Sequence, residues 1–417
     1  MQEGFIGRQR LKYRTAIGTG CAAIALCAVA TTSALAQAAP GIPTGGPTSP
    51  AATLKARQHM FGFENVNPTT GDVRRDRVII SWLTTTTFAV AANGKVFMMD
   101  AFINDDDVVA APARKRTPTG LQELVDLKPE WIFIGHGHGD HTDYIANVAY
   151  RSGATIFGAA EHCASMQRDA VAQFGAGQSV KCTAVLAAGV PIGTKAMDLP
   201  FLKPALCLNV MRHLHGAATP ADTSIPPNGI GFRDGEDPRE FALWGSGAAA
   251  FPAVRTTGGA GGDLAVLYHF TVPGPRAFSL SVYDSVGPYK ELAPNLITEL
   301  SAWPATDVLL GAVSGANNPT NGMRDAAIYV RDMGPKLFVP THHDESQRRR
   351  GAAGSSGELW KRNLVTSMTH IGIPAEKQPE VRWLNDPYDY IRPSLLTFDP
   401  ASPRWAKTAA RPNATCN

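Results

Sequence analysis

The feature that most constrains this chain is a short apolar run that ends abruptly in alternating glycine and histidine. Trp131-Ile132-Phe133-Ile134 is followed directly by Gly135-His136-Gly137-His138-Gly139-Asp140-His141. An apolar run that stops at glycine predicts a buried strand followed by a loop. In α/β folds, the loops that follow strands carry the side chains that bind ligands. The pattern therefore predicts a functional site at the end of this strand.

The four polar residues of this loop are of the types that bind divalent metal ions. Zinc and similar ions prefer imidazole nitrogens and carboxylate oxygens. His136 and His138 are two residues apart, so in extended backbone their side chains point to the same side and can bind one ion. Asp140 and His141 are adjacent and diverge, so this pair faces a second ion beside the first. The alternative is a histidine-rich surface turn.

The H-x-H-x-D-H spacing resembles the metal-binding motif of the metallo-β-lactamase superfamily, whose members are mostly binuclear metallohydrolases. The resemblance implies three further ligands at later positions, and each is present in order. His215 follows the predicted strand that begins near residue 206. Asp284 ends an apolar strand and is followed by serine, and the resemblance implies that it bridges the two ions. His342 follows Pro340 and Thr341.

Three positions carry open alternatives. His215, followed by glycine, resembles the form found in the branch that includes ascorbate-phosphate lactonases, with His213 as its partner. Alternate residues of a strand share a face, so these two roles can be exchanged. His343 stands where that branch usually has an aromatic residue, and we expect it to line the pocket or donate to substrate. Asp100 is either a support beneath the metal loop, as the resemblance implies, or a loop-starting aspartate.

The remaining pattern predicts an α/β (α+β) fold. Asn93-Gly94 predicts a hairpin turn, and hairpins followed by strand–helix alternation occur twice. This order suits a four-layered αβ/βα sandwich, with two mixed sheets face to face and helices outside. The predicted strands are 77–83, 87–91, 96–100, 131–134, 154–157, 180–186, 206–211, 263–271, 277–284, 307–313 and 336–339, and the predicted helices are 120–127, 144–151, 161–174, 291–303 and 324–333.

Composition divides the chain into four parts, the third of which contains an insert. Residues 1–36 have a basic region, an apolar run and a small-x-small cleavage site, which predicts a bacterial signal peptide and a periplasmic or secreted protein. Residues 37–75 predict a flexible leader, and residues 76–384 the hydrolase-like domain. Its irregular, glycine- and proline-rich insert at 216–262 predicts a lid over the substrate. Residues 385–417 predict a tail packed on the domain.

Charge and cysteine content limit the partners of the mature protein. Removal of residues 1–36 lowers the counts of basic and acidic residues from 39 and 36 to 35 and 35. A neutral chain has no long-range attraction to nucleic acid or to a membrane surface, and we expect no stable membrane insertion after cleavage. Four cysteines remain, which permits two disulfides. One possible pairing joins Cys163 to Cys182 and Cys207 to Cys416. The sequence leaves the oligomeric state open.

These observations predict an exported hydrolase acting on a small ester or lactone. Two Zn²⁺ ions, or Fe or Mn in their place, would lie about 3.5–4 Å apart and hold a bridging hydroxide that is nucleophilic at neutral pH. Asp140 is expected to orient this hydroxide and carry its proton. The alternatives are a phosphodiesterase or phospholipase-D-like hydrolase, an iron-dependent oxidoreductase, and a metal-binding protein without turnover. The predicted metal ligands are His136, His138, Asp140, His141, His215, Asp284 and His342, with Asp140 and His343 as catalytic residues.

Overall fold

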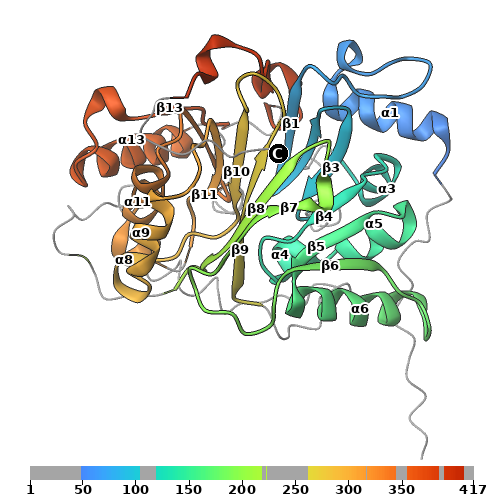
Figure 1. Cartoon of the computed structure of the whole chain (residues 1–417), viewed down its shortest axis with the longest axis horizontal. Helices are drawn as coiled ribbons and strands as arrows, with labels where there is room; N and C mark the ends of the chain where they lie inside the picture. The colour runs from blue at the N-terminus through green and yellow to red at the C-terminus, as the bar shows by residue number, and fades with distance from the viewer. Residues whose placement is uncertain are drawn as a thin grey trace, which may run out of the picture. The chain divides into compact units, whose positions relative to one another are not determined.

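Two seven-stranded sheets face each other, with one of three buried apolar clusters between them (Figure 1). The computed structural model describes residues 48–103, 119–217, 222, 262–315, 317–343, 355–384 and 389–407. The expected signal peptide, residues 37–47 of the leader and nearly all of the insert at 216–262 lie outside these ranges. No helix of the described ranges has both the length and the apolar character needed to cross a membrane.

The first sheet has the order β14-β1-β2-β3-β4-β5-β6. Its strands from β14 to β3 pair antiparallel, and those from β3 to β6 pair parallel. The predicted turn at Asn93 and Gly94 joins β2 to β3, and both residues have positive φ. The strands are β1 Val78–Thr84, β2 Thr87–Ala92, β3 Lys95–Met99, β4 Trp131–Phe133, β5 Thr155–Ala159, β6 Lys181–Leu186 and β14 Thr397–Phe398.

The second sheet has the order β13-β12-β11-β10-β9-β8-β7. It repeats the arrangement of the first, since β7 to β10 pair antiparallel and β10 to β13 pair parallel. Both sheets are therefore mixed, as predicted. The strands are β7 Lys195–Leu199, β8 Cys207–Leu214, β9 Leu264–Thr271, β10 Ser279–Tyr283, β11 Val308–Ala312, β12 Leu337–Thr341 and β13 Glu380–Val381.

Helices cover the outer face of each sheet (Figure 1). One apolar cluster joins α1, α3, α5 and α6 to the first sheet, and another joins α9, α11 and α13 to the second. The predicted four-layered sandwich is confirmed. The helix expected at 291–303 is interrupted at Pro294, which has no N–H to donate. The helices are α1 Pro50–Phe61, α3 Leu121–Asp126, α4 Gly139–Thr142, α5 Ile145–Ser152, α6 Ala160–Phe174, α8 Tyr289–Leu292, α9 Asn295–Ser301, α10 Asn318–Asn321, α11 Arg324–Met333 and α13 Ser355–His370.

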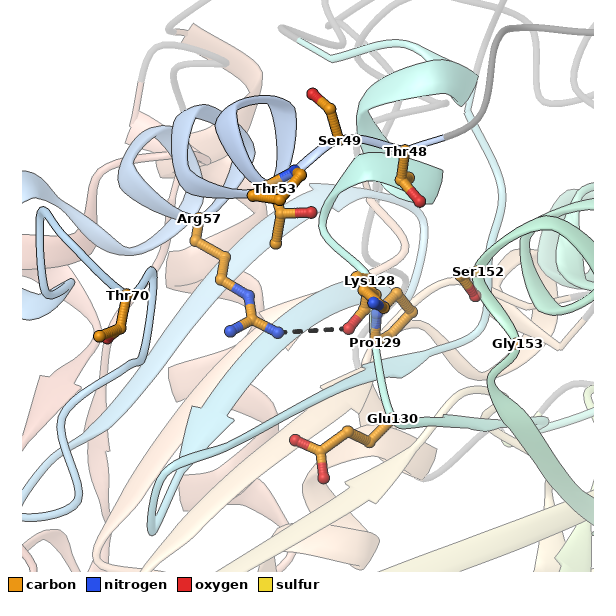
Figure 2. Close-up of a pocket in the computed structure, with 11 residues that line it drawn as sticks. Thr48, Ser49, Thr53, Arg57, Thr70, Lys128, Pro129, Glu130, Ser152 and Gly153 are labelled. Carbon is orange, nitrogen blue, oxygen red and sulfur yellow. Dashed lines mark hydrogen bonds between the residues drawn. The ribbon is translucent and has the colours of Figure 1, made fainter.

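The expected flexible leader is wrong from Pro50 onward, because α1 is an ordered part of the fold. Ser49 caps this helix by accepting from Ala52 N at 3.1 Å, and Met60 and Phe61 are fully buried. Arg57 donates to the carbonyls of Leu127, Gly71 and Lys128. Arg57 also lines a surface pocket of about 540 Å³ next to the N-terminal ends of β4 and β5. Figure 2 shows the residues that line this pocket.

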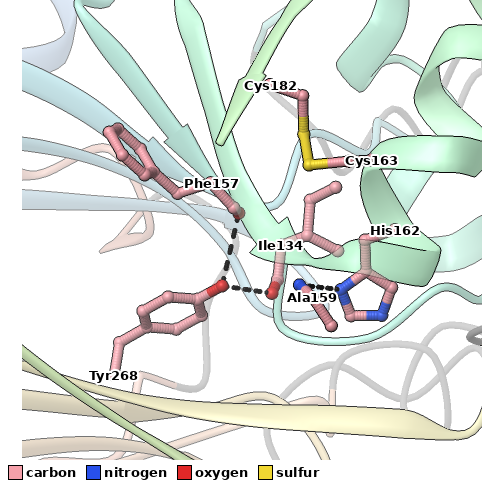
Figure 3. The surroundings of a disulfide bond; sticks show 7 residues. All are labelled: Ile134, Phe157, Ala159, His162, Cys163, Cys182 and Tyr268. Carbon is pink, nitrogen blue, oxygen red and sulfur yellow. Dashed lines mark hydrogen bonds between the residues drawn. A yellow bond between two sulfur atoms is a disulfide. The ribbon is translucent and has the colours of Figure 1, made fainter. Parts of the chain in front are cut away.

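The two sheets are tied together near the end of β4. Tyr268 on β9 donates its hydroxyl to Ile134 O at 2.7 Å and to Phe157 O at 3.3 Å (Figure 3). On the outer side of the first sheet, a disulfide joins Cys163 on α6 to Cys182 on β6, as the first predicted pair. The second pairing includes Cys416, which lies outside the described residues.

The fully buried His269 predicts acid sensitivity. Its Nδ1 lies 2.8 Å from Ser281 Oγ, and burial lowers its pKa from 6.5 to about 3. Between these values the unfolded chain binds the proton and the folded chain does not, so stability is full above pH 6.5 and is lost as the pH falls. The expected loss at pH 5 is about 2 kcal/mol. Urea unfolding at pH 7.5 and 5.0 measures it, with His269→Gln as the control that lacks the titrating group. An equal loss in both proteins would contradict the assignment.

Candidate metal centre

The predicted metal loop begins where β4 ends and runs into the short helix α4. Two backbone hydrogen bonds hold it against the second sheet, from Gly137 N to Gly262 O at 3.1 Å and from Val266 N to Gly135 O at 2.7 Å. Gly135 is required here, because a Cβ would lie 2.0 Å from Asp284 Cγ. The loop from the first sheet thus comes into direct contact with Asp284 from the second.

Three histidines form what we call the first triad: His136, His138 and His215. His136 Nε2 lies 3.1 Å from His138 Nδ1. The ring of His215 lies 4.6 Å from each of the other two rings, measured between centroids. One nitrogen from each ring lies within 4.8 Å of the others, so the three can surround one metal ion. The first two come from the loop after β4, and His215 from the end of β8.

The second triad consists of Asp140, His141 and His342. Asp140 Oδ2 lies 3.5 Å from His141 Nε2 and 3.4 Å from His342 Nε2, and the two nitrogens are 3.3 Å apart. His342 follows β12 with a φ of 59°, and its N–H donates to Thr85 O at 2.9 Å. The structure thus brings together the two predicted halves of this ligand set, although they are distant in sequence.

Asp284 lies between the triads, directly after β10. Its Oδ2 is 2.6 Å from His136 Nδ1 and 3.4 Å from His141 Nδ1. These are the ring nitrogens opposite those that face His138 and His342. Asp284 therefore contacts one histidine of each triad, and its role as a bridging ligand stays a prediction.

The alternative ligand His213 lies behind the triads. Its ring is buried, and its Nδ1 is 3.0 Å from Tyr329 Oη. Burial lowers its pKa to about 4, so it is neutral at neutral pH. Since His215 and not His213 joins the first triad, the geometry favours the first of the two arrangements considered from the sequence.

A buried hydrogen-bond network supports the second triad. His141 Nδ1 lies 2.9 Å from Asp100 Oδ2 and 2.8 Å from Thr86 Oγ1. The other oxygen of Asp100 accepts from Gly135 N at 2.9 Å. Asp100 therefore orients both a predicted ligand and the loop, as a carboxylate behind a metal-binding histidine commonly does. This is the supporting position that the resemblance implied.

The expected role of His343 in the pocket is wrong. Its side chain is completely buried between Trp82 and Trp383, with ring centroids 4.9 and 4.2 Å away. Adjacent residues point in different directions, and here the positive φ of His342 sends the next side chain into the core. His343 packs as the aromatic residue that it replaces would, and cannot reach a substrate.

The charges around the cluster fit bound cations. Burial lowers the pKa of His136 and His215, so their rings offer lone pairs. Burial alone would lower the pKa of His141, but Asp140, Asp100 and Asp284 together raise it to about 10. Three carboxylates thus favour positive charge at this ring.

Two buried atoms give independent support for a bound ion. Asp284 Oδ1 and His213 Nε2 face each other 4.0 Å apart, and neither has a hydrogen-bond partner among the described residues. Such atoms in a buried site call for a ligand or a water molecule. Together with the seven clustered donors, they show that the residues present fit one or two divalent ions.

Sequence reasoning missed one polar residue at the cluster. Asp263 lies just before β9, with its Oδ1 3.0 Å from His138 Nε2 and 3.6 Å from His215 Nδ1. In the sequence it stands at the end of the irregular insert, in no recognisable motif. Its position follows only from the pairing between the metal loop and β9.

Comparison with known proteins gives one curated relative of partial length. A UPF0173 metal-dependent hydrolase from Carboxydothermus hydrogenoformans is 32% identical over 92 residues, which are 22% of this chain and 36% of the relative. The chain thus matches about a third of that protein's length. No protein-family profile matches the chain.

Solved structures show general likeness at low identity. The metallo hydrolase Igni18 from Ignicoccus hospitalis is 15% identical, with a TM-score of 0.42, and the match covers 74% of this chain and 96% of that one. The metallo-β-lactamase fold protein YhfI from Bacillus subtilis is 8% identical, with a TM-score of 0.39 and coverages of 75% and 98%.

Proposed function

We propose that this chain, which has the metallo-β-lactamase fold, is a binuclear metal-dependent hydrolase acting on a small ester or lactone. The observation that carries the proposal is the convergence of seven side chains of metal-binding type from both sheets: six form two adjacent triads, and Asp284 contacts one histidine of each. Donors that lie so far apart in sequence and meet at one point are expected for a metal centre.

The two triads would each hold one ion, with Zn²⁺ as the first choice and Fe or Mn as alternatives. Bound ions would lower the pKa of water to about 7 and polarise the substrate carbonyl. The chain's own residues would orient the water and the substrate. The Asp140 side chain is 31% exposed, whereas that of His141 is buried. The Asp140 carboxylate can therefore contact both solvent and substrate. Although burial raises it, the pKa of Asp140 is held well below its usual value by His141 and His342. The carboxylate is therefore ionised at neutral pH and can accept a hydrogen bond that orients the attacking water.

The charge near the first triad favours a neutral substrate. Asp263 is 82% exposed and lies beside His138 and His215. A carboxylate at this point repels a phosphodiester anion and leaves an uncharged ester or lactone unaffected. A phosphodiesterase is accordingly the second candidate, and a substrate panel distinguishes the two.

Export of the protein is part of this proposal. It rests on the signal-like residues 1–36, and the disulfide between Cys163 and Cys182 supports it. Disulfides persist in oxidising compartments such as the bacterial periplasm. N-terminal sequencing of the mature protein from a cell fraction tests it, with Gln37 as the expected first residue.

Metal content tests the proposed function directly. The purified wild-type protein is expected to hold about two ions per chain, and His342→Ala about one, by elemental analysis. His370→Ala removes an exposed histidine outside the cluster and should keep the wild-type content. Chelation should abolish hydrolysis of lactones and esters and lower the melting temperature, because an ion bound only to the folded state stabilises it. A wild-type protein without tightly held metal, or hydrolysis that survives chelation, would contradict the proposal.

A further inference from the structure

The segment before β9 is fixed against the metal loop. Gly262 O accepts from Gly137 N, and Val266 N donates to Gly135 O. Asp263 lies between these two contacts, so its backbone is held beside His138. The Asp263 side chain therefore starts from a backbone position that is already next to the first triad.

One oxygen of Asp263 lies close to a ring nitrogen of each of two histidines. His138 Nδ1 faces His136 Nε2 at 3.1 Å, so Nδ1 is the nitrogen turned toward the predicted ion. His138 Nε2 points the other way, to Asp263 Oδ1 at 3.0 Å, and His215 Nδ1 lies 3.6 Å from the same oxygen. Asp263 is therefore on the far side of the ring from the metal position and is not a direct ligand in this arrangement.

We propose that Asp263 is a positioning residue that holds His138, and with it His215, in the orientation and tautomer that bind the first ion. The proposal rests on the proposed function, because it needs an ion at the first triad. A carboxylate that accepts the outer N–H of an imidazole fixes the proton there, leaves the inner nitrogen free and increases its basicity. Asp263 thus acts on metal affinity through the histidines.

Each triad then has its own carboxylate, in different surroundings. Asp100 supports His141 from a completely buried position, whereas Asp263 is 82% exposed. Water competes with an exposed carboxylate and weakens its hydrogen bonds. We therefore expect the first ion to depend on Asp263 without the protein depending on it for folding.

Titration of the metal-free protein with Co²⁺ tests the inference, with absorbance resolving the two binding steps. His138→Ala and His342→Ala identify which step belongs to which triad. Asp263→Ala is expected to weaken the first-triad step about 10–100-fold and to leave the other step and the melting temperature of the metal-free protein unchanged. Asp263→Glu should restore part of the affinity. Asp198→Ala, which removes an exposed carboxylate paired with Lys203, is the matched control and should bind as the wild type does.

The outcomes separate the two proposals. If the wild type binds two ions and Asp263→Ala binds both with the same affinities, the role of Asp263 is overturned and the hydrolase proposal stands. Equal weakening of both steps would also overturn it, since a general structural effect would explain that result. A wild-type protein that binds no Co²⁺ would overturn both.

Discussion

Replacement of Asp140 by asparagine is expected to lower kcat for ester or lactone hydrolysis about 10²–10⁴-fold, the range that a positioned general base contributes. The amide has nearly the same size as the carboxylate and can occupy the same place beside His141 and His342. It carries no charge and does not accept a proton at neutral pH. The first triad, which does not include residue 140, should keep its ion.

The comparison requires kcat and metal content from the same preparation of Asp140→Asn. Asp126→Asn is a suitable control, since that carboxylate lies on α3 and accepts from Gln122 Nε2 at 2.8 Å. Wild-type turnover in a metal-replete Asp140→Asn protein would assign the proton transfer to another group. Loss of both ions would show that residue 140 holds the whole centre together.

Replacement of Arg324 by methionine is expected to destabilise the fold by about 3–5 kcal/mol, the usual effect of breaking a buried ion pair. Arg324 is 2% exposed at the start of α11 and pairs with Asp222, Glu291 and Asp325. Methionine fills much of the same space but leaves Asp325, which is equally buried, without its cation.

The free energies of unfolding of Arg324→Met and Lys290→Met, measured with denaturant, compare the loss of a buried cation with the loss of an exposed one. Lys290 contacts the same Asp222 at 3.5 Å but is 52% exposed, so its loss should cost less than about 1 kcal/mol. Similar losses in the two variants would mean that the buried network contributes no more than a surface contact.

The side chains predicted as metal ligands lie together in the structure because the signals that mark them in the sequence are local. Each expected ligand stands within a few residues of a strand end. β4 and β12 each lie in the parallel part of their own sheet, and the loops that follow them meet at the cluster. Two residues near the cluster were not predicted correctly, because local spacing in the sequence does not determine where their side chains lie. His343 turns into a core formed by distant tryptophans, and Asp263 meets His138 only through the pairing of β9 with the loop.

The parts of the fold that were missed have weak patterns of their own. In α1, burial of Met60 and Phe61 comes from contact with the first sheet, while the segment around them is rich in alanine and polar residues. β7 is largely exposed, so it lacks the apolar alternation by which strands are recognised. Tertiary contacts decide such elements.

The last described strand completes the first sheet. β14 pairs with β1, and Phe398 and Trp405 from the same segment are buried between the sheets. On a ribosome, a chain that already contains β1 to β6 still lacks this edge and this part of its core. Residues 78–186 therefore cannot close into their final sheet until about residue 398 has been synthesised. The two halves are made one after the other but must finish folding together, since such distant pairing has to await the whole chain.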